Sequence, residues 1–398
     1  MPPALGPTHP VARLPEEWRA SLAARGERAF AAEQVFGWIH KKGVVDAAAM
    51  TNLSPRLRTS LAEEGLAPGL VSPEEVHRST DGSRKIAVRL ADGATVETVL
   101  LPAVSGRGSA AHADDSARDL DADEAAADVD DADDDEPAGA AKTTRVTQCI
   151  STQVGCAMGC RFCASGVAGL ARHLAAEEIV GQVLLGRALL EPGEAIRNVV
   201  YMGMGEPLHN YEATARSLRL LTHPGGIGLS SRRVTVSTSG LVPEIDRLGE
   251  EFGGQVALAV SLHAADDDTR TALMPINKRY PIKELLAALR RYPLPKRRRI
   301  TIEYTLVSGQ NDDPAEAKRL ARILRGIPVK VNLIPMNPIS ASTLGPPDRA
   351  RVEAFQRVLT DAGLSCFVRR RRGDDVAAAC GQLVLLGKEP KVRGFRRA

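Results

Sequence analysis

The sequence contains no long apolar run, and this absence excludes a membrane-spanning helix. No stretch of its 398 residues approaches the roughly 18 apolar residues that such a helix needs. Residues 1–13 also lack the apolar core of a signal peptide, so we expect a cytoplasmic protein that does not bind membranes. Cysteine is scarce as well. The chain has six cysteines, three of them clustered, which favours a reducing compartment over a disulfide scaffold.

The clustered cysteines are Cys156, Cys160 and Cys163, in a C-x3-C-x2-C spacing on a glycine-punctuated loop. A structural zinc site has four protein ligands, and the sequence offers no obvious fourth at the spacing of a ribbon or knuckle. Thiolates are the ligands of iron–sulfur clusters. Three thiolates on a cubane leave one iron without a protein ligand, and that open iron is where chemistry can take place.

The spacing, with Phe162 directly before the third cysteine, resembles that of the radical S-adenosylmethionine (SAM) superfamily. The resemblance implies a [4Fe–4S] cluster whose open iron binds the amino and carboxylate groups of SAM. It further implies that one electron, supplied by an external donor, cleaves SAM to a 5′-deoxyadenosyl radical.

Charge is unevenly distributed along the chain. Residues 114–136 hold thirteen acids and one base, a net charge of −12, which leaves +15 on the remainder of a chain whose total is +3. A body this basic attracts polyanions and favours a nucleic-acid partner, although a generic solvated basic surface is the alternative. Basic clusters lie at 296–299, 369–372 and 391–397.

Composition shifts divide the chain into five parts. Low hydrophobicity and high charge predict that the third part stays disordered. The first part is expected either to contact RNA or simply to support the rest. The parts are a helical accessory domain at 1–70, a β-hairpin element at 71–102, the acidic insertion at 103–144, the main domain at 145–373 and a C-terminal segment at 374–398.

From residue 144 onward, strand-like and helical stretches alternate. Six βα units predict an α/β fold with a parallel, partly closed barrel, and sites in such barrels gather at the carboxyl ends of the strands. The clustered cysteines follow the first strand, where that rule places a site. The predicted strands are 145–152, 198–202, 233–238, 256–262, 300–306 and 329–334, with an extra strand at 365–369, and the helices are 176–190, 211–221, 243–250, 282–291, 314–324 and 347–362.

Polar and glycine residues recur where the later strands end. Gly205 and Glu206 belong to a Gly-Met-Gly-Glu-Pro turn after the second strand, where a glycine lets the backbone approach a ligand and a carboxylate can hold an ammonium group. Any one such turn is ordinary, but their recurrence at one level of the barrel suits ribose and adenine contacts. The other candidates for cofactor binding are Ser237, Ser261, Leu262, His263 and Asn337.

Two further cysteines and one acid complete the candidates. Cys149 lies on the first strand, and Cys380 follows a run of four arginines that favours its thiolate. Taken singly, each is more often a quiet buried thiol. Glu97 shares a strand face with Val99 and Leu101, so its carboxylate points where apolar side chains point, which raises a carboxyl pKa and suits a general base. The alternative for Glu97 is a surface ion pair on an edge strand.

Taken together, the motifs resemble the RlmN/Cfr family of radical SAM RNA adenine methyltransferases. The match extends from the N-terminal helices to Leu383 and is interrupted only by the insertion. The motifs are Val96-Glu97-Thr98-Val99, Cys149 with Gln153-Val154-Gly155-Cys156, Gly203-Met204-Gly205-Glu206-Pro207, Ser261-Leu262-His263-Ala264, Pro335-Met336-Asn337-Pro338 and Arg371-Arg372-Gly373-Asp374-Asp375 with Ala379-Cys380-Gly381-Gln382-Leu383.

The resemblance implies roles for these residues. Cys380 takes a methyl group from one SAM, a second SAM supplies the radical, Glu97 is the proton acceptor, and Cys149 forms a transient disulfide with Cys380 that an external reductant reopens. The implied target is C2 of adenine in 23S rRNA, at the peptidyl-transferase centre, and of the adenine 3′ of the tRNA anticodon. We expect a monomer.

Three alternatives remain at this point. The first keeps the family and moves the methyl group to C8 of adenine. The second is a zinc-stabilised RNA-binding protein without catalysis, which would be colourless. The third is a radical SAM enzyme that acts on protein, and the basic body and the pair Cys149 and Cys380 disfavour it.

Overall fold

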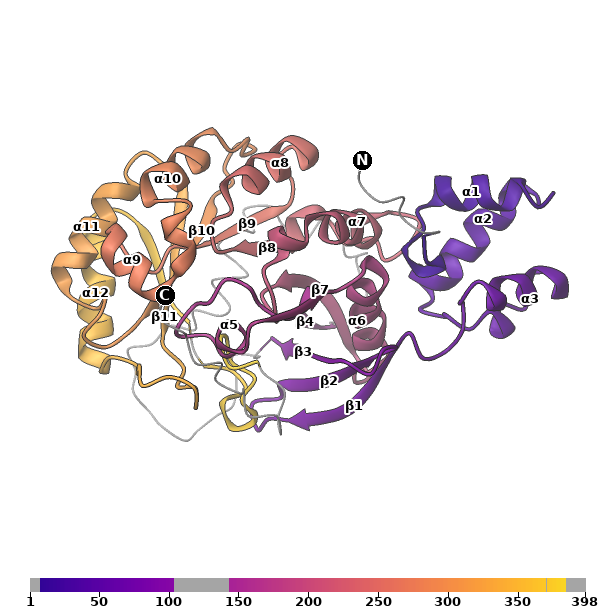
Figure 1. The fold of residues 1–398 in the computed structure, drawn as a ribbon, viewed down its shortest axis with the longest axis horizontal. Coiled ribbons are helices and arrows are strands. Elements are labelled where there is room, and N and C mark those ends of the chain that lie inside the picture. The colour runs from indigo at the N-terminus through magenta and orange to yellow at the C-terminus, as the bar shows by residue number, and fades with distance from the viewer. Residues whose placement is uncertain (1–7, 104–142, 370, 384–398) are drawn as a thin grey trace, which may run out of the picture.

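The computed structural model describes residues 8–103, 143–369 and 371–383, which form one large sheet with helices packed around it (Figure 1). The described strands of this sheet follow the order β1-β2-β3-β4-β7-β8-β9-β10-β11-β12. The predicted disorder of the insertion concerns residues that, but for 103, 143 and 144, lie outside the described ones. The basic cluster at 391–397 also lies outside the described residues.

The predicted parallel barrel is confirmed. From β4 to β12 neighbouring strands of the main sheet run parallel, and the extra strand predicted near 365–369 is present as β12. The strands are largely buried because helices cover the outer face, as a parallel sheet requires. The strands are β4 (Thr144–Cys149), β7 (Glu194–Tyr201), β8 (Val234–Thr238), β9 (Ala257–Ser261), β10 (Ile300–Leu306), β11 (Val329–Pro335) and β12 (Ser365–Val368).

The covering helices begin and end on local signals. In α12, for example, the Asp348 side chain accepts a hydrogen bond from the backbone N–H of Arg351 at 2.8 Å, which caps the first turn. In α8, Gly253 follows the last residue in the left-handed conformation that ends many helices. The helices are α6 (Ala176–Ala188), α7 (Tyr211–Thr222), α8 (Val242–Phe252), α9 (Asp267–Leu273), α10 (Ile282–Arg291), α11 (Pro314–Leu324) and α12 (Arg349–Asp361).

The N-terminal helices form a unit at one end of the molecule (Figure 1). They are α1 (Pro15–Ala23), α2 (Ala29–Phe36) and α3 (Pro55–Glu63). Their buried cluster, which includes Trp18 and Phe36, continues onto Val180 of α6 and Leu220 of α7. The helical unit therefore rests on the outer helices of the barrel rather than on the sheet.

The strands predicted at 71–102 extend the barrel sheet instead of forming a separate element. They are β1 (Val71–Arg78), β2 (Arg84–Leu90) and β3 (Thr95–Pro102), joined by turns at Asp81-Gly82 and Asp92-Gly93. β3 pairs with both β2 and β4, antiparallel in each case. The alternative that put Glu97 on an edge strand is therefore wrong.

A second, two-stranded sheet brackets the cysteine loop, and sequence reasoning did not predict it. It consists of β5 (Gln153–Gly155) and β6 (Leu170–His173), and the short helix α5 (Ala164–Ala168) lies between them. Among the described residues, no helix has both the length and the apolar character needed to cross a bilayer.

Candidate active site

A cavity of about 890 Å³, counting its mouth, lies at the carboxyl ends of the parallel strands. Its size is that of a site for a cofactor or a medium-sized ligand. It brings together ten of the residues singled out from the sequence: Cys156, Cys160, Cys163, Gly205, Glu206, Ser237, Ser261, His263, Asn337 and Cys380. Three others, Leu262, Glu97 and Cys149, lie behind its lining.

The loop that carries the three cysteines is held rigidly at its base. Gly155 has a φ of 78°, and a Cβ added there would lie 1.9 Å from the carbonyl oxygen of Gly169, so only glycine fits. The backbone N–H of Cys156 donates to the same carbonyl at 3.0 Å. The two-stranded sheet thus closes the loop at its neck.

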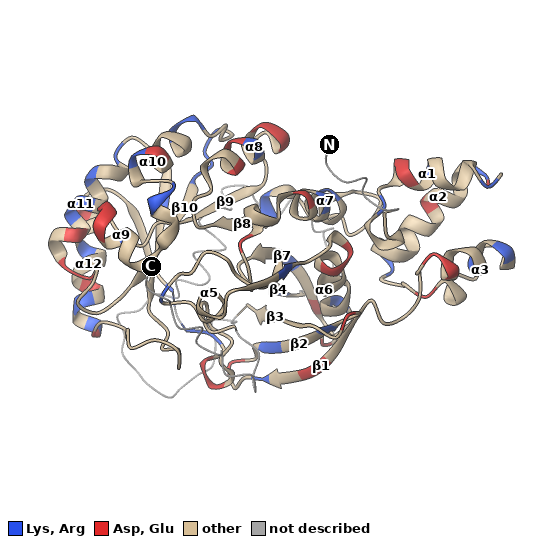
Figure 2. Cartoon of the chain, in the orientation of Figure 1, with Lys and Arg blue, Asp and Glu red and all other residues tan. Residues whose placement is uncertain are grey.

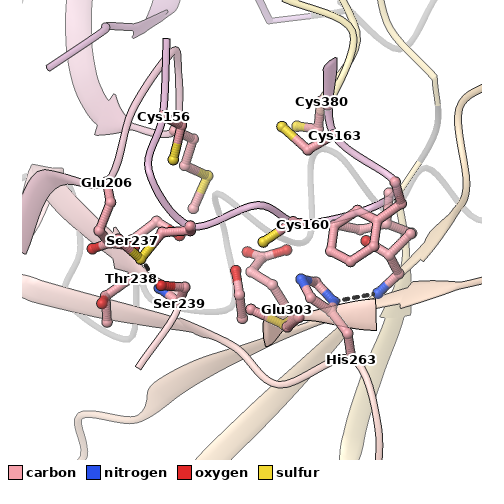
Figure 3. Close-up of a pocket in the computed structure, with 18 of the residues that line it drawn as sticks. Cys156, Cys160, Cys163, Glu206, Ser237, Thr238, Ser239, His263, Glu303 and Cys380 are labelled. Atoms are coloured by element: carbon pink, nitrogen blue, oxygen red, sulfur yellow. Dashed lines mark hydrogen bonds between the residues drawn. The ribbon is translucent and has the colours of Figure 1, made fainter. Parts of the chain in front are cut away.

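The three thiols face a common space at the cavity wall (Figure 3). Burial raises the pKa of Cys156 to about 12 and also raises the pKa values of Cys160 and Cys163. For Cys160, the charges of both other sulfurs contribute to this rise, which shows that the three are close neighbours. As free thiols they would all be neutral, so a bound cation is needed to make them thiolates.

The arrangement suits an iron–sulfur cubane better than a single ion. Among the described residues, no three His, Cys, Asp or Glu side chains are placed to hold one metal ion together. A cubane is a larger guest, because each thiolate binds a different iron. The three-cysteine loop fits a [4Fe–4S] cluster, which its three thiolates would hold while leaving one iron without a protein ligand.

Glu206 is fixed on the wall opposite Cys163 (Figure 3). Its carboxylate accepts hydrogen bonds from the backbone N–H groups of Ser239 at 2.7 Å and Leu208 at 3.1 Å. Burial raises its pKa, although these hydrogen bonds oppose the rise. Glu206 lines the cavity, where its carboxylate is placed to accept from an ammonium group.

Gly205 is required by its surroundings rather than by a ligand. Its φ is 104°, and a Cβ would lie 2.6 Å from the side chain of Gln153. The amide of Gln153 in turn accepts from the backbone N–H of Glu206 at 2.8 Å. The glycine therefore lets the strand β5 and the acidic turn pack against each other.

His263 ends β9 with its ring fixed. Its φ is 55°, and its Nδ1 accepts from the backbone N–H of Thr305 at 2.8 Å. Burial and the nearby Arg270 lower the pKa of His263 to about 3, so the ring is neutral and its proton sits on Nε2. The neighbouring Leu262 has no exposed surface and packs into the core.

Arg270 is a functional candidate that the sequence did not reveal. It is fully buried, and its guanidinium donates to the carbonyl oxygens of Ser239 at 2.8 Å and Leu262 at 3.0 Å. Burial lowers its pKa to about 10, and the charge of Cys160 opposes that fall. Arg270 thus ties the ends of two strands together beside the cysteine loop.

Glu303 and Arg369 also line the cavity and were missed. Glu303 lies in the middle of the buried strand β10, and its carboxylate is 3.8 Å from the guanidinium of Arg369. A single charged residue inside a strand whose other residues are uncharged was the signal that could have revealed it. No such signal marked Arg369, because it belongs to the basic cluster at 369–372, and such clusters are typical of protein surfaces.

The C-terminal segment, residues 371–383, lies over the cysteine loop. The carbonyl of Gly381 accepts from the backbone N–H of Ala164 at 2.8 Å, and that of Cys380 accepts from the Asn337 side chain at 3.0 Å. Cys380 is half-buried, and its sulfur lies beside that of Cys163 in Figure 3. Burial raises the pKa values of Cys163 and Cys149, and the nearby Cys380 adds to both rises.

Glu97 and Cys149 occupy one face of the sheet under this segment. Lys85, Val99 and Cys149 are consecutive register partners on β2, β3 and β4, so their side chains share a face, and Glu97 shares the face of Val99. Both Cys149 and Cys380 are free thiols. The carboxylate of Glu97 is buried and pairs with the ammonium of Lys85 at 3.3 Å.

Some residues of the basic clusters make contacts that stabilise the fold. In the cluster at 369–372, the Arg371 guanidinium donates to the Met336 carbonyl and that of Arg372 pairs with Asp81. In the cluster at 296–299, by contrast, Lys296 and Arg297 are exposed. Figure 2 shows Lys and Arg positions in blue along α10, the loop that follows it, α11 and α12, with acidic positions among them.

A three-cysteine loop beside a polar cavity, at the carboxyl edge of a parallel α/β barrel, defines a radical SAM enzyme. Residues 150–321 match the model of the radical SAM superfamily. Residues 15–65 match that of the "Ribosomal RNA large subunit methyltransferase N-terminal domain". The enzyme therefore uses a [4Fe–4S] cluster and SAM, and the zinc-stabilised, non-catalytic alternative is wrong.

Two relatives and one solved structure narrow the class. The chain is 76% identical over 387 residues to the dual-specificity RNA methyltransferase RlmN of Sorangium cellulosum, covering 97% of this chain and 98% of that protein. It is 42% identical to the RlmN of Syntrophobacter fumaroxidans, over 93% and 95%. A radical SAM methyltransferase from Sphaerobacter thermophilus superposes with a TM-score of 0.81 at 42% identity, over 95% and 99%. The chain belongs to the RlmN family of radical SAM RNA methyltransferases.

Proposed function

We propose that this enzyme methylates C2 of adenine in 23S rRNA and in tRNA, with Cys380 as the methyl carrier. The observation that supports this most directly is the position of Cys380, whose carbonyl is held by Asn337 and whose sulfur lies beside the cysteine loop. A thiol at that point can receive a methyl group and present it to a radical formed in the cavity. The relatives' printed name, dual-specificity RNA methyltransferase, supports two RNA substrates.

Different residues of the chain have different roles in the proposed reaction. Cys156, Cys160 and Cys163 would hold the cluster, and Glu206 would accept from the ammonium of SAM, while the polar strand ends contact its nucleoside. Bound cluster and SAM supply one-electron chemistry, which ends in removal of a hydrogen atom from a methyl group. C2 of adenine is electrophilic, so the electrophilic methyl of SAM does not react there, whereas a carbon radical can add.

Methyl transfer proceeds through Cys380, and Cys149 releases the product. Cys380 thiolate displaces a methyl group from a first SAM, and a second SAM serves the radical step. The resulting methylene radical on Cys380 adds to C2, and the adduct gives one electron to the one-electron carrier that the reaction already requires. Glu97 then takes the C2 proton. Cys149 thiolate attacks the Cys380 sulfur, the carbon–sulfur bond breaks, and the carbon gains a proton to become methyl.

The product is methyladenine and a disulfide between Cys149 and Cys380, which an external reductant must reopen before the next turnover. The proposal also includes an external reductant and an external one-electron donor. It further includes a monomeric enzyme in the cytoplasm. The motifs are common to C2 and C8 methylation, so product chemistry decides between them.

The test is anaerobic reconstitution of the enzyme with iron and sulfide, followed by incubation with SAM and each RNA class. Mass spectrometry of the digested nucleosides should find 2-methyladenosine in both. Formation of 8-methyladenosine would replace the C2 assignment, and methylation of only one RNA class would remove the dual specificity. A colourless protein without methyl transfer to either RNA would overturn the proposal.

A further inference from the structure

Lys85 is a buried cation that joins two parts of the proposed machinery. It lies on β2, where its alternation with Ala87 and Arg89 would place it toward solvent, yet its side chain is only 1% exposed. The ammonium lies 3.3 Å from the carboxylate of Glu97 and donates to the carbonyl of Ala377 at 3.3 Å. Because an ammonium loses several kcal/mol of hydration on burial, these two contacts are what stabilise it.

The Ala377 contact falls at an unusual point of the C-terminal segment. Ala377 has a φ of 50°, a left-handed conformation that is uncommon for residues other than glycine. It ends the short helix η7 (Asp374–Val376) and precedes Cys380 by three residues. The lysine therefore binds the carbonyl of the residue at which the chain turns toward the methyl carrier.

We propose that Lys85 is a positioning residue for methyl transfer, an inference that rests on the function proposed above. It pairs with the Glu97 carboxylate and fixes the turn at Ala377, so that one side chain positions both the base and the carrier. In the step concerned, the C2–H bond of the adduct breaks, the proton passes to Glu97, and the electron pair returns to the adenine ring.

The positioning part is tested on the protein without its cluster. In Lys85→Met, backbone amides in residues 374–383 should exchange hydrogen about tenfold faster or more, because a charged hydrogen bond to the segment is lost. Arg84→Met is the matched control. Arg84 is an equally buried cation on the same strand, but it pairs with Glu194 at 2.6 Å. Exchange in 374–383 should be unchanged in that control, and unchanged exchange in Lys85→Met would overturn the positioning role.

The second measurement uses reconstituted enzyme, SAM and a short RNA that contains a target adenine. Lys85→Met should accumulate RNA-linked protein on a denaturing gel, with product release slower by about a hundredfold. Glu97→Gln should also trap RNA-linked protein, before the C2 proton is removed, and Cys149→Ala should trap it after that step, whereas Arg84→Met should trap none. A merely structural defect would give no linked RNA, because the linkage forms only after the radical step.

The outcomes separate the two proposals. If Glu97→Gln traps the adduct while Lys85→Met turns over like the wild type, Lys85 has no role and the proposed function stands. If the wild type makes no methyladenine, the proposed function itself fails. A folded Lys85→Met that forms neither adduct nor product also overturns the inference. Should Lys85→Met not fold, Lys85→Gln, which keeps a donor but no charge, is judged by the same criteria.

Discussion

At the scale of single residues, burial fixes the charge state of the cavity wall. His263 is neutral near neutral pH because burial and Arg270 lower its pKa to about 3, and its proton is on Nε2 because Nδ1 accepts from Thr305. The pH dependence of stability follows from the protons that the folded and unfolded states bind. Unfolded histidine binds a proton below about pH 6.5, so this residue contributes stability above that pH and loses it as the pH falls.

Cys380 provides the sharpest residue-scale prediction. Cys380→Ala should reduce methyl transfer to background, because the proposed carrier sulfur is gone, while iron content and the brown colour persist, since the three proposed cluster ligands are unchanged. Iron analysis and nucleoside mass spectrometry measure the two effects. Cys366→Ala is the control, because Cys366 is a buried thiol on β12 away from the cavity. Methylated product at normal levels from Cys380→Ala would contradict the carrier role.

At the scale of elements, the turn between β1 and β2 clasps the C-terminal segment. The Asp81 carboxylate accepts from the Arg372 guanidinium at 2.8 Å and from the backbone N–H of Gly373 at 3.0 Å. The backbone N–H of Thr80 donates to Asp375 at 3.1 Å. Burial opposes ionisation of Asp81, but hydrogen bonds from Ser83 and Gly373 outweigh it and hold the pKa of Asp81 well below its usual range.

This clasp predicts a pH-dependent contribution to stability. A carboxylate with a lowered pKa stabilises the folded protein above about pH 4 and loses that contribution as the pH falls. Asp81→Asn should therefore cost about 1–2 kcal/mol near neutral pH, the lower part of the range because the side chain is partly exposed. Denaturant unfolding at several pH values measures the difference between the two proteins. A difference that does not shrink below about pH 4 would argue against the charged clasp.

At the scale of the whole molecule, the acidic insertion is placed where the fold tolerates its removal. β3 and β4 are antiparallel neighbours, and the backbone N–H of Ala103 donates to Arg145 at 2.7 Å, so the two ends of the insertion are adjacent. Residues 104–142 carry a formal charge of −10. Their replacement by a short neutral turn raises the net charge of the protein from +3 to about +13.

That replacement should tighten RNA binding by about tenfold at low salt, with the gain shrinking as salt screens the added attraction. Fluorescence anisotropy at two salt concentrations measures this. A variant of full length with its insertion acids changed to Asn and Gln is the control that separates charge from length. If the two variants differ, length or access rather than charge governs binding.

Local patterns explain how much was predictable. The cysteine spacing, the βα alternation and the polar strand ends are short-range features, so the barrel and ten residues of its cavity wall followed from them. Lys85 and Arg270 were not predictable, because tertiary contacts bury them: Ala377 accepts from the first, and Ser239 after β8 and Leu262 after β9 accept from the second. The pairing of β3 with β4 was missed for the same reason.

The sequence by itself determined the chemistry of this protein, since ligand spacing and strand-end side chains are set by neighbours a few residues apart. Only the tertiary structure decided how that chemistry is arranged. Antiparallel pairing across the insertion places Glu97 and Cys149 on one sheet face, and the C-terminal segment brings Cys380 over it. Such contacts join residues far apart in the chain, and burial and hydrogen bonding select among them only once the whole core has formed.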